Sequence, residues 1–155
     1  MQPIVDGPTQ LAQPKSATEP TPTASPATTR RVRVMIVDDN EEFQQLVKQL
    51  LEPLGYDVQL VSNPVKALEL YQRDKDKIDL ILLDYYMPTL DGGKTFEWLR
   101  KFNPNVKVII CSGADELRLR QLQVQHAIDA YIHKPFRIQE ALFVIRQVMA
   151  KPARR

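Results

Sequence analysis

The sequence predicts an α/β fold in which a parallel sheet is covered by helices on both faces. Short aliphatic runs alternate along the chain with stretches whose apolar residues recur at helical spacing. The runs are dense in Val, Ile and Leu, as expected for strands that are buried on both faces. Five such runs are found, at residues 32–37, 57–61, 78–83, 106–110 and 128–132.

The first strand, 32–37, ends at Asp38-Asp39-Asn40, where Asp39 or Asn40 can cap the following helix. Gly55 suits the end of that helix, although a proline at position 53 is unfavourable in a last turn. The apolar face of the helix is predicted to hold Phe43, Leu46, Val47, Leu50, Leu51 and Leu54. The next strand, 57–61, alternates in polarity and is therefore expected to be more exposed.

The second helix opens at Asn63-Pro64, a cap followed by a first-turn proline. It is predicted to bury Val65, Leu68 and Tyr71. Strand 78–83 is the most apolar and is therefore expected at the centre of the sheet. After Asp91-Gly92-Gly93, the third helix places Phe96, Leu99 and Phe102 on one face.

The fourth strand, 106–110, runs into Cys111-Ser112-Gly113. Residues 115–125 fit both a strand, by their Leu-Arg alternation, and a helix, by their composition. The alternating order of strands and helices on either side favours a helix. A fifth strand at 128–132 precedes a last helix from about Phe136 to Met149.

Composition separates the two ends of the chain from the rest. Residues 1–30 contain six of the twelve prolines and no aromatic residue, so we predict a disordered Pro/Thr/Ala-rich tail. The folded domain is expected over 31–150, followed by a short basic tail at 151–155.

The net charge, the lengths of the apolar runs and the cysteine count exclude several classes of protein. A net charge of +2 gives no basis for nucleic-acid binding or attachment to an acidic membrane surface. The apolar runs fall far below the roughly 20 residues that span a bilayer, and the N-terminus lacks a signal-peptide layout. The single cysteine, Cys111, excludes an internal disulfide and a zinc cluster based on cysteine. These features predict a soluble, cytoplasmic protein.

Polar residues stand where the predicted strands end. Ligands of such sheets bind beyond the carboxyl ends of the strands, so these side chains are expected to converge there. Three close carboxylates repel one another, and an all-oxygen site of this kind suits Mg²⁺. A carboxylate beside Mg²⁺ can attack phosphorus to give an acyl phosphate, with an ammonium and a hydroxyl sharing the charge neutralisation. The residues are Asp38, Asp39, Asp84, Ser112 and Lys134.

Four segments together resemble the receiver domain of two-component response regulators over about residues 31–150. They are VMIVDDN (34–40), LILLDYYMPTLDGG (80–93), VIICSG (108–113) and AYIHKPF (130–136). The resemblance implies a flavodoxin-like fold, a doubly wound five-stranded parallel sheet with strand order 2-1-3-4-5. It also implies transient phosphorylation of one aspartate.

The resemblance also implies a role for each residue of the set. Asp84 resembles the phospho-acceptor, and Lys134 resembles the lysine that pairs with the phosphoryl group. The resemblance also implies that the peptide bond between Lys134 and Pro135 is cis. Ser112 matches the hydroxyl that moves to the phosphoryl group, and Tyr131 matches the aromatic switch that turns inward afterwards. The expected Mg²⁺ ligands are Asp39 directly, Asp38 through water, Asp84, and the backbone carbonyl of Tyr86.

Each of these residues alone also fits an ordinary structural role, as a helix cap, a turn residue or a half-buried aromatic. His126 and His133 have no neighbour at metal-ligand spacing, and we expect both on the surface. Tyr86 is a large side chain next to the acceptor position, which suggests the hypothesis that it shields an acyl phosphate from water. Ala127-Ile128 stand where relatives usually carry Gly-Ala.

The predicted function is a stand-alone response regulator, phosphorylated by a histidine kinase or phosphotransfer protein, and not an enzyme acting on a separate substrate. The resemblance implies output through a downstream protein on the face of the fourth helix, fifth strand and fifth helix. There Leu119, Phe143 and Val144 either add apolar surface for docking or belong to a wider buried stripe, the more common case for any one of them. That face also suits a homodimer, with no direct nucleic-acid or membrane contact. The alternatives are a pseudo-receiver that is not regulated by phosphorylation and a phosphatase with an aspartate nucleophile. The phosphatase would need a second acid where Tyr86 stands.

Overall fold

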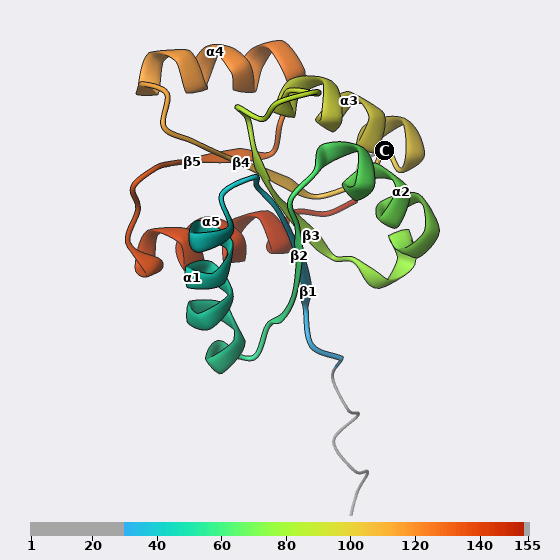
Figure 1. Ribbon diagram of the computed structural model, residues 1–155, viewed down its shortest axis with the longest axis vertical. Helices are drawn as coiled ribbons and strands as arrows, with labels where there is room; N and C mark the ends of the chain where they lie inside the picture. The colour runs from blue at the N-terminus through green and yellow to red at the C-terminus, as the bar shows by residue number, and fades with distance from the viewer. Residues whose placement is uncertain (1–29, 154–155) are drawn as a thin grey trace, which may run out of the picture. The chain divides into compact units, whose positions relative to one another are not determined.

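The computed structural model describes residues 30–153. The predicted N-terminal tail, except for Arg30, and the last two residues of the predicted C-terminal tail therefore lie outside the described residues. Five parallel strands form one sheet with the order β2-β1-β3-β4-β5, which confirms the predicted topology (Figure 1). The strands are β1 (Arg33–Val37), β2 (Asp57–Val61), β3 (Leu80–Asp84), β4 (Val108–Ser112) and β5 (Ala130–His133). The α-helices are α1 (Glu41–Leu51), α2 (Pro64–Asp74), α3 (Gly92–Phe102), α4 (Glu116–His126) and α5 (Ile138–Ala150).

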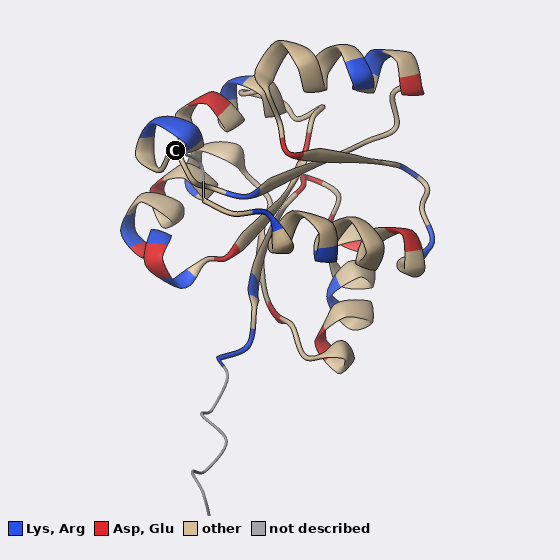
Figure 2. Cartoon of the chain, turned by 180° about the vertical axis from the view of Figure 1, so that it is seen from behind, with Lys and Arg blue, Asp and Glu red and all other residues tan. Residues whose placement is uncertain are grey.

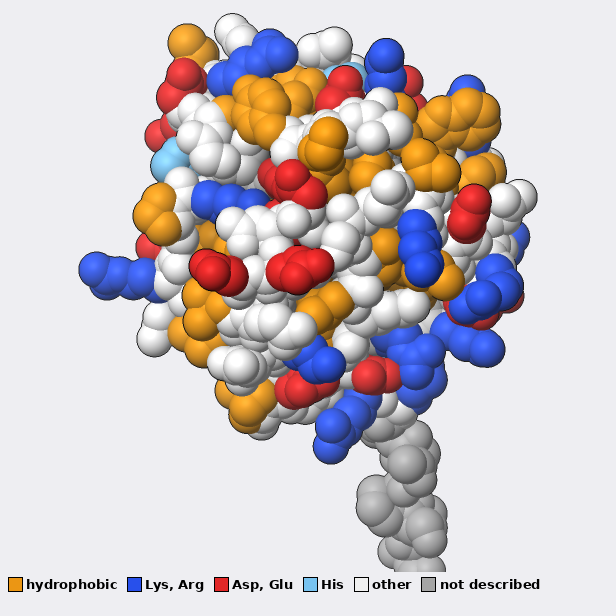
Figure 3. Space-filling model, viewed as in Figure 1, with side chains coloured by type: hydrophobic (Ala, Val, Ile, Leu, Met, Phe, Trp, Pro, Cys, Tyr) orange, Lys and Arg blue, Asp and Glu red, His pale blue; other side chains and the backbone are white. Residues whose placement is uncertain are grey.

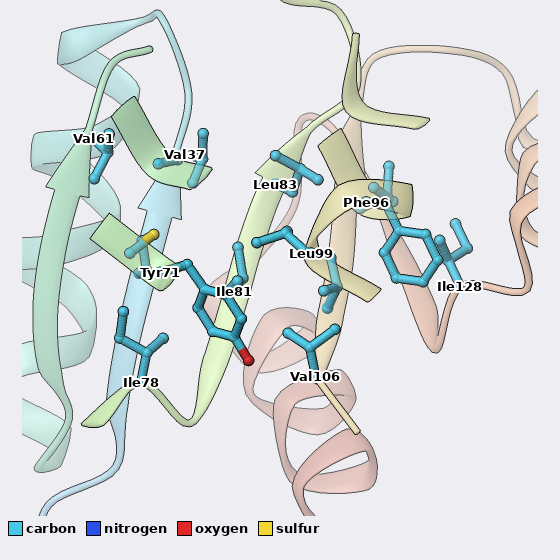
Figure 4. Close-up of a cluster of buried hydrophobic side chains, with 14 of the residues drawn as sticks. Val37, Val61, Tyr71, Ile78, Ile81, Leu83, Phe96, Leu99, Val106 and Ile128 are labelled. Carbon is cyan, nitrogen blue, oxygen red and sulfur yellow. The ribbon is translucent and has the colours of Figure 1, made fainter. Parts of the chain in front are cut away.

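The strands alternate their side chains between two apolar layers. Val34 and Ile36 point to the face covered by α1 and α5, whereas Met35 and Val37 point to the face covered by α2 and α3. Figure 4 shows the second layer, in which Tyr71 and Leu99 lie over Ile81. Both faces of the central β3 are buried, as its unbroken aliphatic run predicted.

Local sequence signals explain where α1 begins and ends. Of the two candidate caps, Asn40 is the one used, and its side chain accepts a hydrogen bond from the Phe43 N–H at 3.0 Å. The helix stops at Leu51, and Glu52–Leu54 continue as a short 3₁₀-helix that contains Pro53. Gly55 closes this turn with φ +94°, a conformation that favours glycine.

Some predicted boundaries and core positions are wrong. β3, β4 and β5 each begin two residues later than predicted, because the apolar residue before each ladder is buried without pairing in it. Those three residues are Ile78, Val106 and Ile128, and all are buried.

Four side chains assigned to the apolar faces of the first two helices are instead largely exposed. Helical spacing predicts a stripe wider than the part of each helix that meets the sheet. Val47 and Leu51 of α1 face the core, as does Tyr71 of α2. The four exposed residues are Leu46, Leu50, Leu54 and Val65.

The ambiguous segment after β4 is a helix, as predicted, and its cap and its end are both defined. Asp115 accepts a hydrogen bond from the Arg118 N–H at 2.8 Å, which caps the N-terminus of α4. The helix ends at Ala127, which takes φ +51°, a left-handed conformation that is unusual for alanine.

Charged residues are distributed over the whole of the described chain, from residue 30 to residue 153. Figure 2 shows Lys and Arg scattered among Asp and Glu over the helices and loops. On the face drawn in Figure 3, apolar side chains lie singly or in small groups among polar and charged ones. Within the described residues, none of the helices combines the length and apolar character needed to cross a membrane.

Candidate functional site

The site forms where the order of the strands reverses, between β1 and β3. Val37 and Leu83 are paired in the ladder, so Asp38 and Asp84, which follow them, stand side by side at the carboxyl edge of the sheet. Together with Asp39 they can offer oxygen atoms that all lie within 4.8 Å of one another. The predicted convergence of the three carboxylates is thus present in the structure.

Asp38 is the most enclosed of the three carboxylates, at 1% exposed. One of its oxygens accepts a hydrogen bond from the Asn40 N–H at 2.9 Å, and the other accepts one from the Lys134 ammonium at 2.5 Å. A buried charge requires such partners, because desolvation without them is costly. The Asp38 side chain is therefore fixed in place, tied to the start of α1 on one side and to the segment after β5 on the other.

Asp84 has weaker partners, although it is only 8% exposed. Its Oδ1 lies 3.7 Å from the Lys134 Nζ and accepts a long hydrogen bond, at 3.4 Å, from the Tyr86 N–H. Burial raises the pKa of Asp84 to about 6; Lys134 opposes this rise, whereas Asp38 and Asp39 add to it. Perturbed carboxylates of this kind are typical of functional sites.

Gly92 lets the loop after β3 fold back over the site. Its N–H donates to the Tyr85 carbonyl at 2.7 Å. A Cβ atom at this position would lie 2.7 Å from the Asp84 carbonyl oxygen and 2.6 Å from the Tyr85 Cα. Only glycine allows this close approach of two backbones, so Gly92 is needed for the geometry around Asp84.

Ser112 and Lys134 enter the site from the ends of the adjacent strands β4 and β5. Ser112 is fully buried, and its Oγ accepts a hydrogen bond from the Ala114 N–H at 3.1 Å. The Lys134 N–H donates to the Ser112 carbonyl at 2.8 Å, which ties the two residues together. The Lys134-Pro135 peptide bond is cis, as the resemblance implied.

The two tyrosines with predicted roles lie at the edge of this arrangement. The Tyr86 side chain is 55% exposed and packs edge-on against Tyr85, with 5.0 Å between ring centroids. Tyr131 is half-buried against the core layer under α2 and α3. A hydrogen bond with the Tyr131 side chain, followed by one with Glu116, raises the pKa of Arg120 on α4. The backbone carbonyl of Tyr86 as a metal ligand and the switch of Tyr131 stay predictions.

Two contacts were missed from the sequence. Phe43, assigned only to the core face of its helix, has the Lys134 ammonium 4.0 Å from its ring centroid. His126, expected on the surface, is only 10% exposed at its side chain and lies 3.3 Å from a carboxylate oxygen of Glu97. The imidazole also packs close to Gly93, where a Cβ atom would meet its Nε2 at 2.7 Å, but nothing in the sequence links these two distant residues. His133 is exposed, as expected.

The donor set of the site fits Mg²⁺. Three carboxylates supply hard oxygen ligands, and Mg²⁺ commonly combines a few of these with water and phosphate oxygens. The exposed Asp39 has open space on its solvent side, whereas Asp38 and Asp84 are held by the protein. A bound Mg²⁺ would supply positive charge that favours the ionised form of Asp84 and attracts a phosphoryl group.

Fold and site together define a class of protein: an α/β domain with an acidic cluster, a hydroxyl and a lysine at the switch point of a parallel sheet. Residues 34–146 match the family model described as "Response regulator receiver domain". The chain belongs to this family, which functions in two-component signalling.

Relatives with curated names and solved structures agree with this assignment. A response regulator named MprA from Mycobacterium leprae is 30% identical over 120 residues, which are 77% of this chain and 52% of the relative. This chain thus spans about half the length of that protein. A CheY-like receiver domain from Methanospirillum hungatei is 28% identical with a TM-score of 0.68, covering 77% of this chain and 94% of the other.

A third relative is the receiver domain of the sensor histidine kinase PA1611 from Pseudomonas aeruginosa. It is 25% identical, with a TM-score of 0.71, and covers 78% of this chain and 99% of its own. Its structure holds a magnesium ion coordinated in the active-site cleft.

Proposed function

We propose that this receiver domain is a phosphorylation-operated switch, with Asp84 as the phospho-acceptor and Mg²⁺ as its cofactor. The observation that carries the proposal is the cluster of Asp38, Asp39 and Asp84 beside Lys134 and Ser112. Magnesium in the cleft of the PA1611 receiver domain supports the choice of metal.

In the proposed reaction, an Asp84 carboxylate oxygen forms a bond to the phosphorus of a phosphohistidine on a histidine kinase or phosphotransfer protein. The phosphorus–nitrogen bond breaks, and its electron pair leaves with the imidazole, which then takes a proton from solvent. Lys134, whose Nζ lies 3.7 Å from Asp84, is placed to pair with the transferred phosphoryl group. Ser112 would exchange its hydrogen bond from Ala114 for one to that group.

The signal is proposed to pass through α4, β5 and α5 to a downstream protein or a second copy. Phe143 is 61% exposed and fits such a face, whereas Leu119, which the sequence also assigned to it, is fully buried in the core. Val144 is half-buried and packs against the layer under α1 and α5. Leu117 of α4, at 69% exposed, adds apolar surface that the sequence did not single out.

A cytoplasmic location belongs to the same proposal, because the single cysteine is buried and the chain therefore has no internal disulfide, as is usual for proteins of a reducing compartment. The pseudo-receiver alternative predicts the same fold without phosphorylation. The phosphatase alternative lacks support at position 86, where a tyrosine stands instead of a second acid.

The test is incubation with acetyl phosphate and Mg²⁺, followed by measurement of intact mass. One added phosphoryl group is expected in the wild type and none in Asp84→Asn. As a matched control, Asp74→Asn removes a partly exposed carboxylate at the end of α2 and should be phosphorylated normally. Absence of phosphorylation in the wild type, or its persistence in Asp84→Asn, would reject the assignment.

A further inference from the structure

The Lys134 ammonium has a third neighbour besides the two carboxylates, the ring of Phe43. The Nζ atom lies 4.0 Å from the ring centroid, well within the distance at which a cation is attracted by an aromatic face. The Lys134 side chain is 21% exposed, so solvent screens this attraction only in part. The ring therefore interacts with the cation that lies against both Asp38 and Asp84.

Both sides of this contact are held by local structure. Phe43 is the third residue of α1, and its N–H donates to the capping Asn40 side chain, directly after the acidic pair. Phe136, two residues beyond the lysine, packs edge-on against the Phe43 ring, with centroids 5.8 Å apart and planes at 88°. The cap of α1 and the segment after β5 thus fix the ring where the lysine ends.

We propose that Phe43 is a positioning residue that holds the Lys134 ammonium at the phospho-acceptor. Lysine has a long, flexible stem, and much of its rotational freedom must be lost before the ammonium can pair with a phosphoryl group. The ring face restricts that freedom before phosphorylation, so less of it is lost during the transfer. The inference deepens the proposed function and rests on it.

The competing explanation is that Phe43 only fills space. It lines a groove of about 290 Å³ with Leu46, Leu50 and Phe136, and it packs against the core layer under α1 and α5. A leucine at position 43 would retain apolar packing but would lose the aromatic face. Phe43→Leu and Phe43→Tyr therefore distinguish the two explanations, since tyrosine keeps the face.

The first measurement is an NMR spectrum of the Lys134 εCH₂ protons, without metal or phosphodonor. An aromatic face this close should shift these protons upfield in the wild type and in Phe43→Tyr, and the shift should vanish in Phe43→Leu. This result does not depend on whether Asp84 accepts a phosphoryl group, so a failure of the proposed function would not change it.

The second measurement is the rate of phosphorylation by acetyl phosphate with Mg²⁺. Phe43→Leu should be slower by about fivefold, as expected for the loss of one partly screened cation–π contact, and Phe43→Tyr should stay near the wild-type rate. Leu46→Ala, in the same groove and 55% exposed, is the matched control and should change neither measurement.

An unshifted Lys134 signal in the wild type, or one that stays shifted in Phe43→Leu, would overturn the inference. Equal rates for Phe43→Leu and the wild type, or an equal loss in Phe43→Tyr, would overturn it as well. If the wild type itself gains no phosphoryl group, the proposed function fails, and the NMR shift alone decides whether Phe43 positions the lysine.

Discussion

The Lys134 ammonium lies 2.5 Å from a carboxylate oxygen of Asp38 but 3.7 Å from the nearest oxygen of Asp84. The lysine is therefore hydrogen-bonded to Asp38, whereas it forms only a longer ion pair with Asp84. Asp38, which also accepts the Asn40 N–H, has both oxygens paired. Asp84 is held more loosely and has a pKa raised by burial, which is consistent with its proposed role as the phospho-acceptor.

Loss of the lysine should destabilise the fold. Lys134→Met keeps the stem but leaves the Asp38 carboxylate buried without its cation, and removing one partner of a fully buried pair costs about 3–5 kcal/mol. Because the lysine is 21% exposed, we expect a smaller loss, about 2–3 kcal/mol in the free energy of unfolding. Urea unfolding at pH 7 measures this loss in the free energy of unfolding. Lys66→Met, at an exposed position on α2, is the control, and equal stability of the two variants would contradict the prediction.

Neutralising Asp84 should stabilise the protein at neutral pH. The folded pKa of about 6 exceeds the ordinary value of 3.8, so the folded state binds more protons than the unfolded state between these values. Stability therefore falls as pH rises from about 4 to about 6 and stays reduced above. Without divalent metal, Asp84→Asn should gain about 2 kcal/mol at pH 7.5 and nothing below pH 4, as urea unfolding at each pH measures.

Asp74→Asn is the control for this pH series. Arg73 lowers the pKa of Asp74, so removal of this carboxylate should not stabilise the protein at neutral pH. A gain for Asp84→Asn that is the same at pH 4 and pH 7.5 would show that its cause is not the ionisation of the carboxylate.

The sequence predicted the topology and the residues at the strand ends because both depend on patterns along the chain. Apolar periodicity identified the sheet and the helices, and parallel strands bring their carboxyl ends together whatever the details of packing. The choice of Asn40 over Asp39 as the cap was not predictable, because both residue types cap helices well. It is decided by the structure, in which Asp38 receives the Asn40 N–H and Asn40 receives the Phe43 N–H.

Contacts between elements that are distant along the chain could not be predicted from the sequence. Phe43 and Lys134 are separated by most of the domain, and only the packing of α1 beside the end of β5 brings them together. The burial of Leu119 has a similar cause: a helix with apolar residues on several sides does not reveal which side meets the sheet. His126 was assigned to the surface because its partner, Glu97, lies on another helix.

Tyr86 should prolong the phosphorylated state. Its backbone N–H contacts the Asp84 carboxylate, and its exposed ring stands edge-on to Tyr85. The hypothesis is that the ring limits the access of water to an acyl phosphate on Asp84. In Tyr86→Asn, the phosphorylated protein should lose its phosphoryl group roughly 3- to 10-fold faster, equivalent to a barrier lower by about 1 kcal/mol. The decay of intact mass after removal of acetyl phosphate measures the rate. Tyr86→Phe keeps the ring and should match the wild type, whereas unchanged or slower decay in Tyr86→Asn discards the hypothesis.

Glycine at position 127 should stabilise α4. Ala127 ends that helix at φ +51°. This left-handed conformation costs a non-glycine residue about 1–2 kcal/mol. Glycine removes this cost, but part of the benefit is offset by the greater freedom of glycine in the unfolded chain. The free energy of unfolding of Ala127→Gly should therefore rise by about 0.5–1 kcal/mol, seen as a higher melting temperature. Ala150→Gly, at the end of α5, should lower it, since glycine is a poor helix former. A lower melting temperature for Ala127→Gly would contradict this account.

Magnesium should stabilise the folded protein through Asp39. A ligand that binds only the folded state adds RT ln(1 + [L]/Kd), about 2.7 kcal/mol at 100 times Kd. Asp39 is exposed and has room for a metal on its solvent side, so Asp39→Asn should remove most of this gain, whereas Glu69→Gln on α2 should retain it. Because protons compete for Asp84 below its pKa of about 6, the gain should also be smaller at pH 5 than at pH 7.5. Thermal unfolding with and without Mg²⁺ measures both effects, and a gain that is equal in Asp39→Asn and the wild type would place the metal elsewhere.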